Sequence, residues 1–267
     1  MNLNNRLSVK KKIVIKVGTS SITHPNGSLN IRQMRRFTRI VSDIKNSGRD
    51  IILVSSGSIG LGMGLMGLKT KPEDIPSKQA LSAVGQCELM NIYDDMFGKY
   101  SVKVGQVLLT KNLVDERIMN VRNTFNKLLE YGVLPIVNEN DSVAIDELYP
   151  NYGENDTLSA VVSVITGAEL LIILSDIDGL FEENPKENPD AKLIPVVNEI
   201  SDHIKEISGG RGSALGTGGM STKIEAAKIA MENGIDMVIM NIENPERLYD
   251  LILDDKPVGT LFRNLNY

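Results

Sequence analysis

Residues 12–17, KIVIKV, form a short apolar run rich in β-branched side chains, and Gly18 follows it. The run DIILVS at 50–55 has the same character and leads into further Ser and Gly residues. Runs of this length bounded by Gly or Ser are typical of buried β-strands. Between them, apolar residues recur at helical spacing up to Gly48: Ile31, Met34, Phe37, Ile40, Val41 and Ile44. The stretch 12–55 therefore predicts a strand, a helix and a second strand.

The same alternation continues along the whole chain. Further strands are predicted at 104–110, 133–138, 170–175 and 236–240, and helices near 77–97, 120–131, 155–166, 220–233 and 245–252. The pattern predicts an α/β fold, a mainly parallel sheet covered by helices on both faces. No low-complexity linker, repeat or charge block interrupts it, so we expect one domain with two lobes meeting near residue 170. Ligands of such sheets bind at the carboxyl ends of the strands.

Composition narrows the function classes. The chain has 267 residues, of which 42% are hydrophobic but only 4% aromatic, so its core must consist mainly of aliphatic side chains and Met. A net charge of -5 argues against a general nucleic-acid surface, and binding of a polyanion would require a few locally placed lysines. We expect no membrane span and a cytosolic location, because no apolar run reaches the length of a signal or a membrane helix.

Cysteine and histidine are scarce. Cys87 is the single cysteine, which excludes an internal disulfide and a multi-cysteine zinc site. It lies in an apolar helical stretch, so we expect a buried thiol. His24 and His203 are the only histidines and are far apart in the sequence, so they predict no metal cluster.

Two segments place a lysine beside glycines. Lys16 lies inside the first apolar strand and is followed by Gly18. A lysine there needs a partner for its ammonium group, or it reaches solvent from the edge of the sheet. Lys223 ends the run GTGGMSTK at 216–223, which precedes a helical pattern. Glycines, Ser/Thr and a lysine at a helix start are typical of phosphate binding, although the P-loop spelling is absent.

The segment after the second strand, SSGSIGLG at 55–62, predicts a helix start facing an anion. It continues as GMGLMG at 62–67, which matches the dinucleotide-binding pattern G-x-G-x-x-G. The match begins several residues after the strand and lacks the acidic residue expected about 20 positions later. A flexible apolar cover over the site is the preferred interpretation, and a nicotinamide-dependent oxidoreductase is a weak alternative.

Three polar segments follow the remaining strands or open helices. NENDSV at 138–143 comes directly after an apolar strand, and its Asp141 either receives an ammonium group or caps a helix. GENDT at 153–157 opens a helix, so capping alone also explains Asp156. LSDIDGL at 174–180 is a turn after a strand, for which a purely structural role of Ser175 and Asp176 remains open.

Taken together and in this order, the segments KVGTS, SSGSIGLG, NENDSVA, GENDTLSA, LSDIDGLF and GTGGMSTK resemble the amino-acid kinase family, and within it the glutamate 5-kinases. The resemblance runs from about residue 10 to about 262. It implies a three-layer αβα sandwich around a mainly parallel sheet, with an acid-substrate lobe at about 10–168 and a nucleotide lobe at about 169–262. It also implies the first step of proline biosynthesis, phosphorylation of the side-chain carboxylate of L-glutamate by ATP with Mg²⁺.

The resemblance also implies residue roles. Lys16 and Lys223 would contact the ATP phosphates, and Asp156 would hold both lysines. Glutamate would be bound by Ser56, Asp141 and Asn155. The nucleotide would be bordered by Ser175 and Asp176, and its phosphates wrapped by Thr217, Gly218, Gly219, Met220, Ser221, Thr222 and Lys223. No metal site on the protein is implied, because Mg²⁺ arrives with ATP.

The chain departs from the family pattern in two places. Related chains often carry Asp where this one has Glu154, and many carry a C-terminal RNA-binding-like PUA domain, whereas this chain stops at Tyr267 without one. Proline as a feedback inhibitor, a glutamyl-phosphate reductase as a partner and a homo-oligomer are family expectations, whereas no nucleic-acid partner is expected because of the net negative charge. The rival functions are an acetylglutamate or carbamate kinase, and a non-catalytic nucleotide or amino-acid sensor on the same scaffold.

Overall fold

The computed structural model describes residues 6–18, 23–24, 29–110, 115–143, 155–185, 187–209 and 219–263. Of the residues singled out above, Glu154, Thr217 and Gly218 lie outside these ranges. The chain divides into two compact units. One unit comprises Val17–Asn155, and the other comprises Met1–Lys16 together with Asp156–Tyr267. Each unit is described by itself.

The expected α/β fold with a mainly parallel sheet is confirmed. The sheet has eight strands in the order β3-β4-β2-β1-β5-β7-β8-β6. The pairs β2–β4, β3–β4, β5–β7 and β6–β8 are parallel, and only β7–β8 is antiparallel among the strand pairs whose register is described. Parallel neighbours place their carboxyl ends at the same edge, where ligands of such sheets bind.

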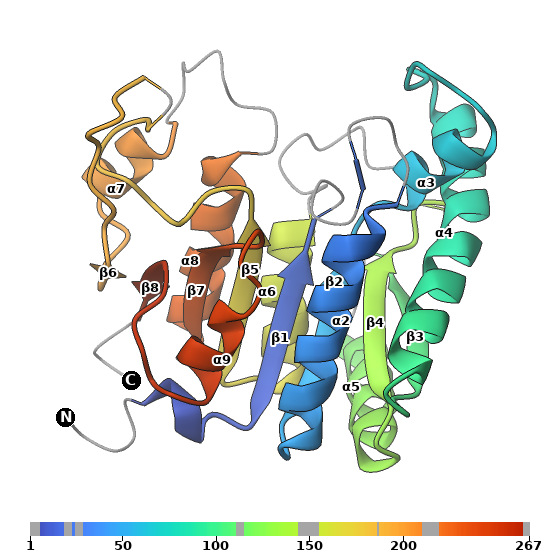
Figure 1. Ribbon diagram of the computed structural model, residues 1–267, viewed down its shortest axis with the longest axis horizontal. Helices are drawn as coiled ribbons and strands as arrows, with labels where there is room; N and C mark the ends of the chain where they lie inside the picture. The colour runs from blue at the N-terminus through green and yellow to red at the C-terminus, as the bar shows by residue number, and fades with distance from the viewer. Residues whose placement is uncertain are drawn as a thin grey trace. The chain divides into compact units, whose positions relative to one another are not determined.

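The unit 17–155 contains three parallel strands, β2 (Asp50–Ser55), β4 (Leu134–Glu139) and β3 (Val104–Leu109). Its helices are α2 (Ile31–Asn46), α3 (Ser58–Leu65), α4 (Ile75–Gly98) and α5 (Asp115–Glu130). Helix α2 lies in front of β2 and α5 lies behind β4, so both faces are covered (Figure 1). Asn30 and Asp74 cap α2 and α4 by accepting the amides of Gln33 and Ser77. These caps satisfy helix amides that have no partner within the helix.

The second unit contains β1 (Lys12–Val17), β5 (Leu170–Ser175), β7 (Asp236–Asn241), β8 (Thr260–Phe262) and the short β6 (Val196–Val197). Its helices are η2 (Leu7–Val9), α6 (Asn155–Thr166), α7 (Asp202–Ile207), α8 (Met220–Glu232) and α9 (Arg247–Ile252). Helix α9 lies in front of the strands and α6 behind them (Figure 1). Every residue of β5 is buried, as a strand covered on both faces requires.

One expectation from the sequence is wrong. Cys87 is exposed, because the buried face of α4 is formed by residues such as Ser82, Gln86 and Leu89, and Cys87 points away from that face. In the stretch 62–67, Gly62 and the residues up to Leu65 continue α3, and a role of this stretch as a cover over the site stays a prediction. Within the described residues, none of the helices has the length and apolarity needed to cross a membrane.

Candidate active site

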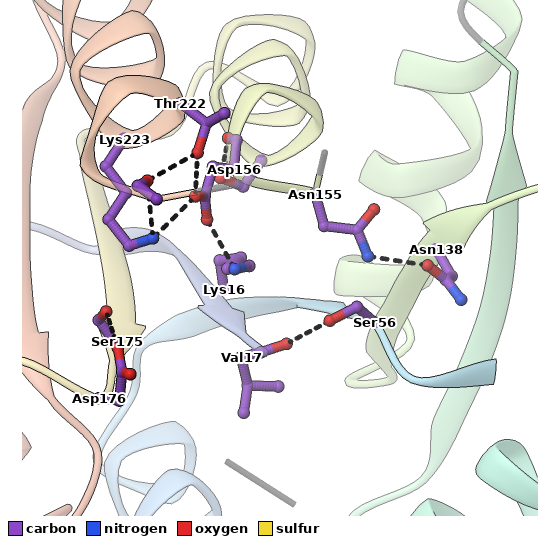
Figure 2. Close-up of polar contacts among 12 residues, drawn as sticks. Lys16, Val17, Ser56, Asn138, Asn155, Asp156, Ser175, Asp176, Thr222 and Lys223 are labelled. Atoms are coloured by element: carbon purple, nitrogen blue, oxygen red, sulfur yellow. Dashed lines mark hydrogen bonds and ion pairs between the residues drawn. The ribbon is translucent and has the colours of Figure 1, made fainter. Parts of the chain in front are cut away.

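A buried carboxylate with two lysine partners forms the centre of the second unit. Lys16 comes from β1, Asp156 from the first turn of α6 and Lys223 from the first turns of α8. The Lys16 Nζ atom lies 2.6 Å from Asp156 Oδ1, and the Lys223 Nζ atom lies 3.1 Å from Asp156 Oδ2 (Figure 2). The Asp156 side chain is only 1% exposed, and those of Lys16 and Lys223 are 12% and 10% exposed. One carboxylate thus gathers two ammonium groups from segments far apart in the sequence.

The charges of this cluster do not cancel. Burial of the Asp156 carboxylate favours its neutral form, but the ammonium groups of Lys16 and Lys223 outweigh burial and hold the pKa of Asp156 below its ordinary value of 3.8. Thr222 Oγ1 donates a hydrogen bond to Asp156 Oδ2 at 2.9 Å. With one anion and two cations, the cluster keeps an excess positive charge. Such a cluster is suited to a polyanionic ligand.

The start of α8 adds main-chain donors beside this charge. Gly219 is the N-cap residue of α8. Because glycine has no side chain, the first amides of the helix receive no side-chain cap. Such amides, at the positive end of a helix, are suited to phosphate oxygens. Met220, Ser221 and Thr222 form the first turn, so these predicted residues lie together with Lys223. Thr217 and Gly218, which precede them, lie outside the described residues.

Ser175 and Asp176 lie at the carboxyl end of β5, in the same unit as the lysine pair (Figure 2). Ser175 is buried and its Oγ donates to Asp176 Oδ1 at 3.1 Å, whereas Asp176 is exposed. The contact is also what a simple strand-to-turn transition would give. Their assignment to the nucleotide therefore stays a prediction.

The three residues predicted to bind the acid substrate all belong to the unit 17–155. Ser56 follows β2, and both its amide and its Oγ approach the carbonyl oxygen of Val17, at 3.3 and 3.5 Å. Asn155 Nδ2 donates to Asn138 Oδ1 at 2.9 Å (Figure 2). Asn138 is itself in β4, whose carboxyl end lies at the same edge as that of β2 because the two strands are parallel.

Asp141 is held by two hydroxyl groups. Ser58 Oγ donates to Asp141 Oδ2 at 3.0 Å, and Ser82 Oγ donates to the same oxygen at 2.9 Å. Asp141 lies in the turn after β4, and the residues that follow from 144 to 154 lie outside the described ranges. The described contacts orient the carboxylate through one of its two oxygens.

The positions of Lys16 and of the glycines after β2 exclude two interpretations of the sequence. Lys16 does not extend into solvent, because its ammonium group pairs with Asp156. The glycines of the G-x-G-x-x-G match do not form a strand-to-helix turn, because Gly62 and Gly64 lie inside α3. A dinucleotide-binding fingerprint requires that turn, so the oxidoreductase hypothesis loses its only support.

Several residues that shape this site were not predicted. Ser82 and Gln86 on α4 contact predicted residues or their neighbours, and Asn138 links Gln86 to Asn155. A signal was present in the sequence: Ser82 and Gln86 are polar residues four positions apart in a largely apolar helical stretch. Polar groups on the buried face of a helix need partners, and that requirement points to a polar network.

Comparisons with known proteins find relatives over nearly the whole chain. The profile of the amino acid kinase family matches residues 11–241. The glutamate 5-kinase of Clostridium perfringens is 52% identical over 264 residues, covering 97% of this chain and 98% of that protein. The glutamate 5-kinase of Enterococcus faecalis is 47% identical, with 97% of each chain covered.

Solved structures with a similar fold have much lower sequence identity. The UMP kinase of Ureaplasma parvum has a TM-score of 0.64 at 15% identity, covering 96% of this chain and 99% of its own. The isopentenyl phosphate kinase of T. acidophilum, in a product complex, has a TM-score of 0.65 at 18% identity, covering 95% of this chain and all (100%) of its own. At such identities the likeness concerns the fold alone. The family profile and the near full-length relatives establish that this chain belongs to the amino acid kinase family.

Proposed function

We propose that this chain transfers the γ-phosphate of ATP to the side-chain carboxylate of L-glutamate, giving L-glutamyl 5-phosphate and ADP. This is the first step of proline biosynthesis. Relatives about half identical to this chain over nearly its whole length carry the name glutamate 5-kinase. The observation that carries the mechanism is the Asp156 carboxylate, which holds the ammonium groups of Lys16 and Lys223 at 2.6 and 3.1 Å.

The chemistry explains why two lysines are needed. A carboxylate oxygen of glutamate attacks the γ-phosphorus while the bond from phosphorus to the ADP oxygen breaks, so two anions must approach each other. The attacking carboxylate is already ionised near pH 7, with an ordinary pKa of about 4.3, so no general base is required. Catalysis then consists of positioning and charge neutralisation, which Lys16, Lys223 and the Mg²⁺ bound to ATP supply.

Asp156 has a supporting role in this mechanism. It does not react; it fixes the two ammonium groups where phosphate oxygens bind, and its single negative charge leaves one positive charge in excess. The amides at the start of α8, from Gly219 through Thr222, add neutral donors beside Lys223. We assign Thr217, Gly218, Ser175 and Asp176 to the nucleotide as well, on the basis of the resemblance.

The acid substrate is assigned to Ser56, Asp141 and Asn155. An oriented carboxylate such as Asp141 is a suitable receptor for the α-ammonium group of a free amino acid, whereas acetylglutamate and carbamate have no such group. Asn155 and Asp156 are consecutive residues, so their Cα atoms are about 3.8 Å apart across a trans peptide. A residue assigned to glutamate is therefore bonded directly to the residue that holds the phosphate-binding lysines.

The test is glutamate-dependent formation of ADP, with hydroxylamine present to trap an acyl phosphate as the hydroxamate. We expect ADP and hydroxamate in equal amounts with L-glutamate, and neither with acetylglutamate or with ammonium carbamate. ADP formation with acetylglutamate or carbamate instead would assign a different acid kinase. Binding of ATP and glutamate without ADP release would assign a sensor.

Glutamate and ATP are assigned to different residues, so a substitution in one set should change the KM of one substrate and not that of the other. Asp141→Asn removes the charge that we assign to the α-ammonium group, so it should raise the KM for glutamate and leave the KM for ATP unchanged. An unchanged KM for glutamate would leave Asp141 with a structural role only.

Four further properties stay proposals that rest on the family resemblance. They are a homo-oligomer, inhibition by proline, a reductase that consumes the labile acyl phosphate, and a cytosolic location.

A further inference from the structure

We propose that Ser82 and Gln86, one turn apart on α4, are positioning residues for the acid substrate. Ser82 acts through the carboxylate of Asp141, and Gln86 acts through the amides of Asn138 and Asn155. The inference rests on the proposed function of Asp141 and Asn155. It adds that a single helix, which carries none of the residues predicted to touch substrate, sets the orientation of two of them.

The contacts of Ser82 fix one oxygen of Asp141. Ser82 is buried, with 3% of its surface exposed, and its Oγ lies 2.9 Å from Asp141 Oδ2. Ser58, 2% exposed, donates to the same Oδ2 at 3.0 Å, and the two hydroxyl oxygens are 3.0 Å apart. Among the described residues no donor is recorded for the other oxygen, Oδ1. The two serines therefore hold the carboxylate by one oxygen and leave the second for an ammonium group.

The contacts of Gln86 fix the direction of an amide chain. Asn155 Nδ2 donates to Asn138 Oδ1 at 2.9 Å, and Asn138 Nδ2 donates to Gln86 Oε1 at 2.8 Å. Asn138 Oδ1 also accepts the amide of Glu139 at 2.9 Å, which prevents Asn138 from reversing its amide. With its Nδ2 committed to Asn138, Asn155 keeps its carbonyl oxygen as an acceptor for the substrate.

Gln86 makes this chain at a cost. Its Nε2 atom is buried and has no hydrogen-bond partner in the described part of the chain. An unpaired buried donor is rare and unfavourable in native proteins. Reversing the Gln86 amide would place Nε2 against the donor Nδ2 of Asn138, so the structure keeps the unpaired donor to retain the acceptor. A residue that served packing alone would gain nothing from this arrangement.

The backbone explains how one helix reaches both groups. Ser82 and Gln86 are four residues apart and so lie on the same face of α4. Helix α3, beside the upper part of α4 in Figure 1, packs on it through two glycines. A Cβ atom on Gly85 would lie 1.7 Å from the carbonyl oxygen of Ser58, and one on Gly62 would lie 2.0 Å from that of Leu81. This close approach brings the Ser58 hydroxyl to Ser82.

The test separates positioning from packing by comparing Ser82→Ala and Gln86→Leu with Ser163→Ala. Ser163 is a matched control, because it is fully buried in α6 and its Oγ donates only to the carbonyl oxygen of Ser159, at 2.7 Å. We expect each α4 variant to raise the KM for glutamate about tenfold, with kcat within about threefold and the KM for ATP unchanged. The control should leave all three constants unchanged.

A second readout uses glutarate, which has both carboxylates of glutamate but no ammonium group. If Ser82 acts through Asp141, Ser82→Ala should leave the inhibition constant of glutarate unchanged while the KM for glutamate rises. In the Asp141→Asn background, Ser82→Ala should add little further change, because both substitutions remove the same interaction. Ser82→Cys, which replaces the hydroxyl by a weak donor of similar shape, repeats the comparison should Ser82→Ala fold poorly.

The proposal is overturned if the KM for glutamate stays within twofold of the unmodified protein in Ser82→Ala and Gln86→Leu. It is also overturned if glutarate binding weakens as much as glutamate binding does. Failure of the proposed function looks different, because then the unmodified protein forms no glutamate-dependent hydroxamate at all.

Discussion

The charge balance of the lysine cluster predicts that Asp156→Asn and Lys223→Met have very different effects on the stability of the protein. Asp156→Asn leaves two ammonium groups, which are 12% and 10% exposed as side chains, without a counter-charge. At an effective dielectric constant of 20, unit charges at 2.6 and 3.1 Å attract by about 6 and about 5 kcal/mol. Desolvation offsets much of this gross attraction, and removal of one partner from a buried pair typically costs about 3–5 kcal/mol.

Lys223→Met should behave differently. It leaves Lys16 and Asp156 as a balanced pair and relieves the repulsion between the two ammonium groups, so we expect the free energy of unfolding to change by less than about 1 kcal/mol. The same variant should lose about 100-fold or more in kcat, because a charge that neutralises the transferring phosphate is gone. Stability and activity are thus expected to separate within one cluster.

The assay is urea unfolding at pH 7.5 without nucleotide, followed by far-ultraviolet circular dichroism because the chain has no Trp. Asp202→Asn is the matched control, since Asp202 pairs with Lys205 at 2.9 Å but is fully exposed, and we expect no measurable change. The reasoning is refuted if Asp156→Asn and Lys223→Met unfold with equal free energies, or if Lys223→Met turns over at a normal rate.

Three further predictions concern the same two units. Lys16→Ala should lower kcat about 100-fold or more in an ADP-release assay, and near-normal turnover with an intact fold would remove Lys16 from the mechanism. The pKa of Asp156 in the folded state lies below its ordinary value of 3.8, so the ion pairs stabilise the protein above that pH and less as the pH falls below it. Urea unfolding across pH should therefore show that the stability difference between the unmodified protein and Asp156→Asn shrinks as the pH falls. Gly85→Ala should lower the free energy of unfolding by about 3 kcal/mol or more, because its Cβ would meet the Ser58 carbonyl oxygen at 1.7 Å. Gly98→Ala in the same helix is the control, because its Cβ would have nothing within 4 Å and should leave the stability unchanged. Equal melting temperatures of the two variants would contradict the close helix contact.

Most strands could be predicted from the sequence because buried parallel strands are uninterrupted apolar runs. The predicted ranges 12–17, 50–55 and 170–175 coincide with β1, β2 and β5. Strands β6 and β8 were missed because they have two and three residues, too few for any periodicity. The helix start predicted in the segment 55–62 is found, because α3 begins at Ser58, but the four glycines or serines among its eight residues gave no indication of where it ends.

The candidate site could be predicted only in part. Family motifs pointed to Lys16, Asp156 and Lys223, and the structure brings their side chains together. The motifs gave no indication of Ser82 or Gln86, because these residues lie in a helix whose sequence carries no motif. The role proposed for them rests on contacts with partners that are 59 and 52 residues away, Asp141 and Asn138. The exposure of Cys87 was predicted wrongly for a related reason. Apolar residues occur on more than one face of α4, so the composition of the stretch could not identify its buried face.

The peptide bond between Asn155 and Asp156 has a consequence for sequence variation. Both residues lie in the first turn of α6, where inserting one residue rotates all that follows by about 100° around the helix axis. Such an insertion would leave the Asn155 amide beside Asn138 and turn the Asp156 carboxylate away from Lys16 and Lys223. The order of these two residues therefore cannot be interrupted without separating the two sets of contacts.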